Sequence, residues 1–190
     1  VEVRDYVTGE WTLVPLAGPA NRQGRIAADV ICGREARFRG TQGTAVVGLF
    51  GLTLATTGVN EKRLKAAGKS YQKIYTYTMD HAGYYPGASP IAMKLLYEPD
   101  SGRLLGAHAV GQSGVEKRID VLAMAIQMKA TVFDLEEAEL CYAPQYGSAK
   151  DPVNMAGFVA ANIIRDDVDV VHWSERPEPS DDENAGPLVI

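Results

Sequence analysis

The order in which strand and helix patterns follow one another most strongly constrains the fold of this chain. From Gly43 to Gly111 the sequence consists mainly of short runs rich in Val, Leu, Thr and Tyr, which are typical of strands. From Val115 onward the apolar residues recur with helical periodicity instead. Strands grouped before helices indicate an α+β fold rather than an alternating parallel sheet.

Three runs carry the strand prediction. The first, "TAVVGLFGLTLATTGVN", contains Gly48 and Gly51, which we interpret as bulges or points of close backbone approach. The second, "YQKIYTYTMD", alternates along its length and places its tyrosines on one face. The third, "PIAMKLLYEPDSGRLLGAHAVG", predicts two strands joined by a turn at Pro99-Asp100-Ser101-Gly102. Between the first two runs, "NEKRLKAAG" predicts a short helix that ends before Gly68.

The helical part of the sequence begins with "VEKRIDVLAMAIQMKA". Its apolar positions fall on one stripe, which predicts a helix facing the core: Ile119, Leu122, Ala123 and Ile126. A further helical turn is predicted in "TVFDLEEAEL", and a last helix in "DPVNMAGFVAANIIRDDV".

The first 36 residues carry patterns of their own. Val1 to Val14 alternates apolar and polar residues around Thr8-Gly9, which predicts a hairpin or strand remnant. We expect a loop at Ala17-Gly18-Pro19, then a helix capped by Asn21 that runs to about Cys32. The first residue is valine and the last three are Leu-Val-Ile, so we expect an excised fragment of a longer protein.

Charge and hydropathy exclude several classes of function. The net charge is −5, and residues 174–184 carry four of these negative charges, so the rest of the chain is nearly neutral. It has no basic stripe of the kind that nucleic-acid binding requires. No apolar run approaches the length of a membrane span, and no secretory signal opens the chain. The acidic, Pro- and Ser-containing stretch is typical of a solvated linker.

The cysteines and histidines do not predict a metal site. Cys32 and Cys141 are far apart, belong to no CxxC pair and stand beside apolar residues, so we expect buried free thiols in a reducing cytoplasm. The three histidines are widely scattered, which leaves no ligand set for a metal ion.

Two loops concentrate reactive side chains. The segment Leu140 to Ile164, "LCYAPQYGSAKDPVNMAGFVAANII", places Tyr142 and Tyr146 between prolines before an apolar helix. The segment "DHAGYYPGASP" places His81, Tyr84 and Tyr85 directly after a strand. Alternatively, both loops are well-packed turns with a purely structural role. The sequence contains no GxGxxG or Walker loop, HExxH or GxSxG motif, and hence no complete catalytic constellation.

Five segments resemble a known family when they are taken together and in order. They are "LAGPANRQGRIAADVICG", "GTAVVGLFGLTLATTGVNEKRLK", "HAGYYPGASPI", "GRLLGAHAVGQSGVEKRIDVLAMAI" and "LCYAPQYGSAKDPVNMAGFVAANII". From about Pro15 to Val171 the chain is similar to the C-terminal part of FAD-dependent pyridine nucleotide–disulfide oxidoreductases. Within that family it resembles the coenzyme A disulfide reductase and NADH oxidase branch. "SERPEPSDDENAGPLVI" resembles the linker into a rhodanese domain that some of these reductases carry.

The resemblance implies a fold and a domain organisation. The family's dimerisation domain is an antiparallel sheet of about five strands flanked by helices. By this resemblance, residues 1–36 are a remnant of the FAD-binding domain and residues 37–171 are the dimerisation domain. Residues 172–190 are then an acidic linker and the start of a rhodanese domain.

The resemblance also implies site residues. Ala17, Ala20 and Asn21 match the end of the FAD domain, near the flavin's pyrimidine side. Tyr84 or Tyr85, together with Tyr142, match the tyrosines that reach the redox cysteine and thiol substrate of the partner subunit. We assign substrate binding to His81, Lys117 and Arg118, although a dimer-interface salt bridge explains the last two equally well. Gln145, Tyr146 and Gly147 depart from the family pattern after "YAP", which leaves the acceptor open.

We therefore expect a cytoplasmic dimerisation fragment of a flavoprotein that uses FAD and NAD(P)H to reduce a disulfide such as coenzyme A disulfide. The fragment is expected to form a homodimer, to bind no cofactor and to be inactive alone. Two alternatives remain. One is a free-standing dimerisation or protein-binding module, and the other is a fragment of an NADH oxidase that reduces oxygen or polysulfide.

Overall fold

The computed structural model describes residues 1–172. The strands of this part are β1 (Glu2–Arg4), β2 (Trp11–Leu13), β3 (Ala45–Leu49), β4 (Leu52–Gly58), β5 (Gln72–Met79), β6 (Pro90–Tyr97) and β7 (Leu104–Gly111). The helices are α1 (Ala17–Ile31), α2 (Glu61–Ala66), α3 (Val115–Gln127), α4 (Val132–Glu136) and α5 (Pro152–Ile164). All but the first residue of the predicted acidic linker and start of a rhodanese domain, residues 172–190, lie outside the described residues.

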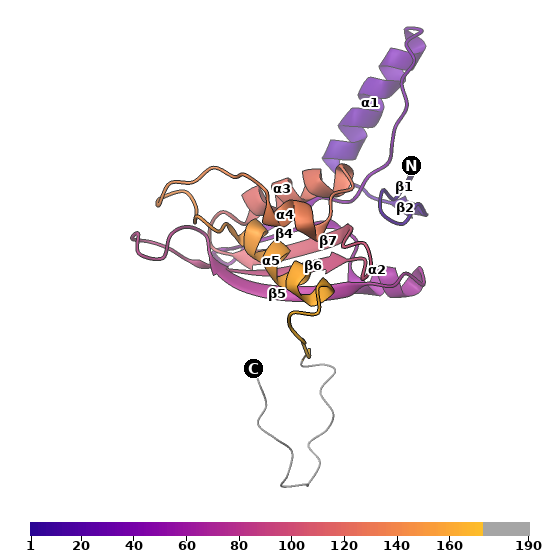
Figure 1. Ribbon diagram of the computed structural model, residues 1–190. Coiled ribbons are helices and arrows are strands. Elements are labelled where there is room, and N and C mark those ends of the chain that lie inside the picture. Colours follow the sequence, from indigo (N-terminus) through magenta and orange to yellow (C-terminus); the bar gives the residue numbers. More distant parts are fainter. Residues whose placement is uncertain (173–190) are drawn as a thin grey trace.

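The main sheet has five antiparallel strands in the order β3-β4-β7-β6-β5 (Figure 1). This confirms the α+β prediction of an antiparallel sheet of about five strands flanked by helices. The predicted turn between β6 and β7 is present, where Gly102 has a φ of 69° and its N–H donates to the Glu98 carbonyl at 3.0 Å.

The interpretation of Gly48 and Gly51 as bulges or close approaches is wrong. A Cβ atom added at either position would meet nothing within 4 Å. Gly51 instead forms the two-residue turn between β3 and β4 together with Phe50, and both have positive φ angles, of 80° and 49°. Hairpin turns of this kind match the twist of the flanking strands, which is why glycine is favoured there.

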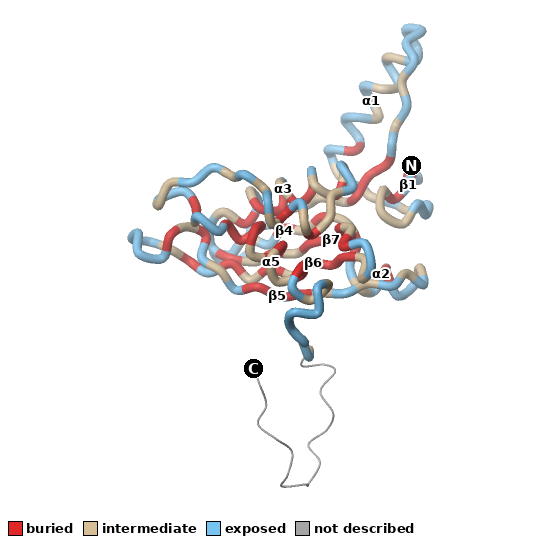
Figure 2. Tube along the Cα trace, viewed as in Figure 1, coloured by how far each residue is buried: buried red, intermediate tan, exposed pale blue. Residues whose placement is uncertain are grey.

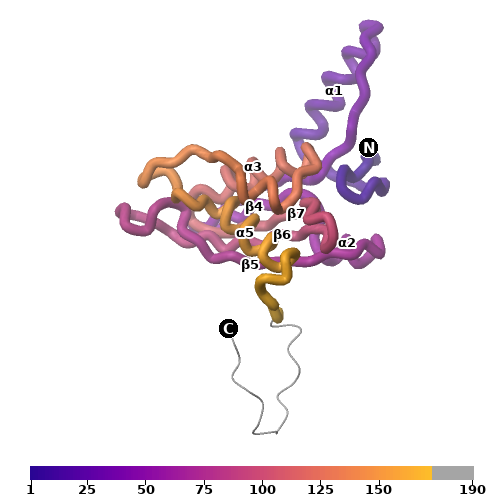
Figure 3. Tube along the Cα trace, in the orientation of Figure 1, coloured from indigo at the N-terminus to yellow at the C-terminus, as the bar shows by residue number. Residues whose placement is uncertain are grey.

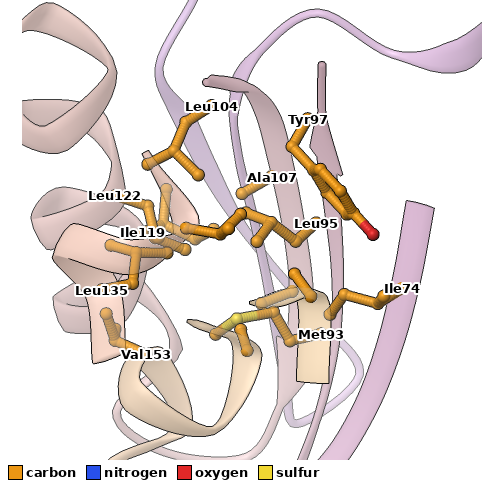
Figure 4. Close-up of a cluster of buried hydrophobic side chains, with 14 of the residues drawn as sticks. Ile74, Met93, Leu95, Tyr97, Leu104, Ala107, Ile119, Leu122, Leu135 and Val153 are labelled. Carbon is orange, nitrogen blue, oxygen red and sulfur yellow. The ribbon is translucent and has the colours of Figure 1, made fainter. Parts of the chain in front are cut away.

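Helices α3 and α5 pack on one face of the sheet and enclose the hydrophobic core (Figure 4). The predicted stripe of α3 is confirmed, because all four of its residues are buried: Ile119, Leu122, Ala123 and Ile126. Three of them, Ile119, Leu122 and Ile126, belong to the same buried cluster as inward-facing strand residues such as Leu95 and Ala107. Gly157 lets α5 approach α4 closely, since an added Cβ would lie 2.6 Å from the Glu136 nitrogen.

The opposite face of the sheet is only partly covered within residues 1–172. Leu64 of α2 packs at one end of it, with Leu96 and Leu105. Beyond that end a row of cross-strand neighbours shares this face: Val47, Leu54, Val110, Ala92 and Tyr77. The outermost members of the row are exposed, with Val47 at 51% and Tyr77 at 77%. We call this row and its neighbours the open face.

The N-terminal segment forms the predicted hairpin, β1–β2, followed by a helix that projects from the sheet (Figure 1). The prediction of a loop at Ala17–Pro19 and a cap at Asn21 is wrong, because α1 begins at Ala17. A proline in the first helical turn loses no intrahelical hydrogen bond, so Pro19 does not delay the start. The Asn21 side chain donates to the Ala17 carbonyl from within the helix instead. Pro19 is the buried residue of α1. Most of the projecting helix is exposed or half-buried (Figure 2).

The cysteines differ from the prediction in their environment. Cys32 and Cys141 are unpaired but both are exposed, so the expectation of buried thiols is wrong. Cys32 lies at the end of the projecting α1 and Cys141 lies in the loop before α5, so apolar neighbours in the sequence do not bury either thiol.

Candidate functional site

The two tyrosine-bearing segments form neighbouring loops. One is the 80–89 loop between β5 and β6, and the other is the 137–150 loop between α4 and α5. The backbone N–H of Ala82 joins them, with the Gly147 carbonyl at 2.9 Å and the Pro144 carbonyl at 3.3 Å. Both loops extend from the same end of the sheet (Figure 3).

Tyr84 and Tyr142 meet across these loops. Their hydroxyl oxygens lie 3.1 Å apart, and the side chains are exposed, at 77% and 50%. The hydrogen bond with Tyr142 raises the pKa of the Tyr84 phenol above its usual value. Two adjacent phenols that face solvent can donate to a single anionic atom, such as a thiolate sulfur.

Tyr85 is placed differently. Its backbone N–H donates to the Ala82 carbonyl, and its ring packs edge-on against His81 with 5.9 Å between centroids. The geometry therefore pairs Tyr84, rather than Tyr85, with Tyr142. Tyr146 is exposed at 69%, and its backbone N–H closes a turn onto the Ala143 carbonyl.

Asp80 organises the start of the 80–89 loop. Its carboxylate accepts hydrogen bonds from the backbone N–H groups of His81 and Ser89 and from the Ser89 hydroxyl. Burial opposes ionisation of Asp80, but the bonds from Ser89 and the nearby His81 outweigh it and lower its pKa. His81 Nδ1 lies 2.9 Å from the same carboxylate, and Nε2 lies 3.4 Å from the Pro86 carbonyl. His81 is thus turned into its own loop.

Arg118, which we assigned to substrate binding, does not face solvent in this protomer. It is 2% exposed, and its guanidinium forms an ion pair with Asp151, with 2.8 Å between Nη2 and Oδ2. The same group donates to the Asp80 and Gly114 carbonyls. Helical periodicity could have indicated this position, because Arg118 adjoins the buried Ile119 and Leu122 on the inner face of α3.

Asp151 is not among the site residues predicted from the sequence, although the sequence around it has the pattern of a helix cap. It caps α5 by accepting from the Val153 N–H, and the Asn154 side chain completes a capping box. An aspartate directly before a proline and three residues before an amide is typical of such a cap. Lys117, also predicted to bind substrate, is half-buried and forms no ion pair with another residue of the described part.

The residues assigned to flavin binding lie far from the tyrosine loops. Ala17, Ala20 and Asn21 belong to the first turns of α1, which Figure 1 shows at the other end of the molecule from the tyrosine loops. Ala17 and Ala20 line a hollow of about 560 Å³ between α1 and the β1–β2 hairpin, and Asn21 does not. No group of three metal-ligating side chains occurs within residues 1–172, and no helix there could cross a bilayer.

Comparison with known proteins identifies the domain. Residues 44–151 match the family described as pyridine nucleotide-disulphide oxidoreductase, dimerisation domain. The coenzyme A disulfide reductase of Staphylococcus epidermidis is 43% identical over 148 residues, which cover 77% of this chain and 33% of that protein. The Staphylococcus aureus enzyme of the same name is 40% identical with the same coverage. The chain therefore spans about a third of the length of these relatives.

Solved structures agree with this match. Reduced Bacillus anthracis CoADR-RHD has a TM-score of 0.90 at 51% identity, covering 92% of this chain and 32% of its own. The NAD-dependent persulfide reductase from A. fulgidus has a TM-score of 0.85 at 42% identity, covering 88% and 31%. The water-forming NADH oxidase from Lactobacillus brevis, at 22% identity and a TM-score of 0.84, shares the fold, with 89% and 38% covered. This chain belongs to the pyridine nucleotide-disulphide oxidoreductase family, and residues 44–151 match the family's dimerisation domain.

Proposed function

We propose that this chain is the dimerisation part of a flavoprotein that uses NAD(P)H to reduce a disulfide such as coenzyme A disulfide. In this proposal Tyr84 and Tyr142 enter the active site of the partner subunit. The observation that carries it is the pair of hydroxyls 3.1 Å apart on two solvent-facing loops. Relatives named coenzyme A disulfide reductase support the substrate class.

The tyrosine pair suits a leaving thiolate. Reduction of a disulfide by a thiolate releases the second sulfur as an anion, and its departure is faster when that anion is stabilised. Tyr84 and Tyr142 can both direct O–H groups at one sulfur if their mutual hydrogen bond opens. Removing a single donor of this kind typically costs about 10²-fold in rate.

The residues assigned to FAD fit a contact with one edge of the flavin. Leu16 caps α1 without a side-chain hydrogen bond, so the first backbone N–H groups of the helix are not bound by a capping side chain. Such groups attract negative charge. Ala17 and Ala20 are small and border the hollow beside the hairpin, which leaves room for a planar ring. The flavin supplies the electron transfer when it is bound, and this chain's residues orient it.

We propose that two subunits share each active site, because the flavin contact and the tyrosine pair of one chain lie far apart. The first turns of α1 and the tyrosine loops lie at different ends of the described part (Figure 1). A second copy can bring its tyrosines to the flavin contact of the first. We propose that the copies pair through the open face, whose hollow of about 250 Å³ is lined by residues such as Leu54, Tyr77 and Val110.

The domain boundaries complete the proposal. Residues 1–36, with the projecting α1, belong to the FAD-binding part, and residues 37–171 form the dimerisation domain. Residues 172–190 form the linker towards a further domain. The 51% identity with Bacillus anthracis CoADR-RHD supports this organisation.

The decisive experiment uses the intact flavoprotein that carries this chain. Tyr84→Phe, Tyr142→Phe and the double variant are assayed for NADH oxidation with coenzyme A disulfide, with a persulfide and with oxygen. We expect kcat with coenzyme A disulfide to fall at least 10-fold, while electron transfer to ferricyanide is unchanged. Tyr146→Phe, on the same loop, is the matched control. Full disulfide activity in the double variant contradicts the proposal.

A second acceptor, a persulfide, is favoured by one observation. The structural relative from A. fulgidus is titled an NAD-dependent persulfide reductase and is 42% identical to this chain. A persulfide also releases an anionic sulfur, so the same hydroxyls serve it. The acceptor with the larger kcat/KM in the assay above decides between the two.

A further inference from the structure

The two tyrosine loops are tied to the rest of the domain by a buried ion pair. The side chains of Arg118 and Asp151 are 2% and 3% exposed. Buried guanidinium and carboxylate groups are stable only when they are paired and fully hydrogen-bonded. The fold of a small domain does not require such a pair, since apolar residues fill the same space at least as well.

The contacts of Arg118 fall at the base of both loops. Nη2 donates to the Asp80 carbonyl at 2.5 Å, where the 80–89 loop begins. Nε and Nη2 donate to the Asp151 carboxylate, at 3.2 Å and 2.8 Å to Oδ2, where the 137–150 loop ends. Nη1 donates to the Gly114 carbonyl at the start of α3, at 3.1 Å. One rigid planar group therefore spans three segments that are distant in sequence.

The surroundings are shaped to admit this group. Gly114 has a φ of 66°, and a Cβ atom there would lie 2.3 Å from Arg118 Nη1. Asp80 offers its carbonyl to Arg118 while its carboxylate holds the backbone of His81 and Ser89. Asp151 likewise binds Arg118 while it caps α5. Asp80, through its carbonyl, and Asp151, through its carboxylate, therefore each bind Arg118 while the same residue organises a loop or a helix start.

We propose that Arg118 is a positioning residue: its bonds to Asp80 and Asp151 set the separation of the two loops and thereby keep the Tyr84 and Tyr142 hydroxyls in contact. The effect of Arg118 on catalysis rests on the proposed function, whereas its effect on the Tyr84–Tyr142 contact does not. If the guanidinium is lost, the Asp80 carbonyl and Asp151 carboxylate are left buried without their partner, and hydrating them separates the loop ends.

A role in stability alone predicts different behaviour. In that case, replacing both members of the pair by uncharged residues restores the protein completely. If Arg118 positions the tyrosines, the same double replacement restores folding but not the contact between Tyr84 and Tyr142. The double variant Arg118→Met/Asp151→Ser makes this distinction, because serine still caps α5 and no unpaired buried charge remains.

The first experiment uses this chain itself. Tyrosines labelled at Cζ are titrated by NMR in the wild type, in Arg118→Lys and in Arg118→Met/Asp151→Ser. We expect the Tyr84 pKa to fall towards the usual tyrosine value in the double variant, with thermal unfolding that stays cooperative. Arg165→Met is the matched control, because Arg165 forms a two-pronged ion pair with Glu136 on the far end of α5. An unchanged Tyr84 pKa in the folded double variant overturns the proposal.

The second experiment measures the coupling in the intact flavoprotein. We expect Arg118→Met/Asp151→Ser to lower kcat with the disulfide about 10-fold, and to have no further effect once Tyr84 and Tyr142 are both phenylalanine. An equal loss of kcat in the wild type and in the protein with both phenylalanines shows that Arg118 does not act through the tyrosines. If the phenylalanine variants alone keep full activity, the proposed function fails, and the titration still decides whether Arg118 positions the loops.

Discussion

The Tyr84 and Tyr142 hydroxyls are 3.1 Å apart, although 58 positions separate the two residues in the sequence. Neither loop makes this contact by itself. The 80–89 loop is organised by the Asp80 carboxylate, and the Ala82 N–H links it to the 137–150 loop. The contact therefore depends on the relative position of the two loops. A substitution in either loop should alter the environment of the tyrosine in the other.

Tyr142→Phe should lower the Tyr84 pKa. The hydrogen bond with Tyr142 raises that pKa, so its loss should return the Tyr84 phenol towards about 10, the value of an exposed tyrosine. NMR titration of Cζ-labelled tyrosine measures the change. Tyr146→Phe leaves the hydrogen bond in place and should leave the Tyr84 pKa where it is; a shift in that control would assign the effect to the loop as a whole.

If two copies pair through the open face as proposed, Leu54→Asp should weaken the dimer by about 100-fold or more, because it places a charge in the centre of that apolar interface. Leu54 is 47% exposed on β4 and neighbours Val47 and Val110 on the open face. Sedimentation or light scattering over a concentration series gives the dissociation constant. Ile31→Asp, on the projecting α1, is the control and should not change it. Equal dimer stability in Leu54→Asp would place the interface elsewhere.

Glu61→Gln should lower stability at neutral pH by about 2 kcal/mol. Glu61 accepts from the Tyr71 hydroxyl and forms ion pairs with Lys73 and Lys94. Burial raises its pKa, but these partners outweigh burial and lower the pKa to about 2.

The pH dependence of stability follows from this lowered pKa of Glu61. The folded-state pKa lies below the ordinary value of 4.5, so the contribution of Glu61 is complete above about pH 4.5 and is lost as pH falls towards 2. Urea unfolding across this range should show the wild type and Glu61→Gln converging at low pH. Glu98→Gln, in the more exposed pair with Arg103, should cost less than about 1 kcal/mol. A constant difference between wild type and Glu61→Gln down to pH 2 would contradict this assignment.

Tyr97→Phe should leave stability unchanged or raise it by about 1 kcal/mol. Tyr97 belongs to the buried cluster (Figure 4). Its hydroxyl is buried and has no hydrogen-bond partner among the described residues, and burial raises its pKa to about 12. Removing an unsatisfied buried hydroxyl removes a desolvation cost. Thermal unfolding measures the effect. Tyr6→Phe is the contrasting variant, because the Tyr6 hydroxyl donates to the Gln127 carbonyl at 2.8 Å, and its loss should cost about 1 kcal/mol. A clear loss in Tyr97→Phe would mean that the hydroxyl is bonded after all.

Local patterns were sufficient to predict most of the fold. The turn at Gly102 and the apolar stripe through Ile119 and Leu122 were predictable because their signals depend on neighbouring residues. The start of α1 was missed because Asn21 is a good cap, but a helix can begin at Leu16 without any side-chain cap. The capping preference of one residue is worth only about 1 kcal/mol, so surrounding structure overrides it.

The site was less predictable, for a physical reason. The sequence identified Tyr84, Tyr85 and Tyr142 but could not choose between Tyr84 and Tyr85, because the choice depends on which ring turns towards His81. The buried position of Arg118 depends on Asp80 and Asp151, which lie 38 and 33 residues away. Pairings over such distances are fixed by the fold, and periodicity in one helix does not reveal them.

The position of β3 at the margin of the sheet has a consequence for the lone protomer. This strand is paired on one side only, and it exposes Val46, Val47 and Leu49. An apolar marginal strand with unpaired backbone groups is a template for uncontrolled strand addition. If the open face mediates pairing, a second copy covers the Val47 side chain but leaves the in-plane backbone groups of β3 unpaired, so β3 is the strand at which we expect aggregation to begin.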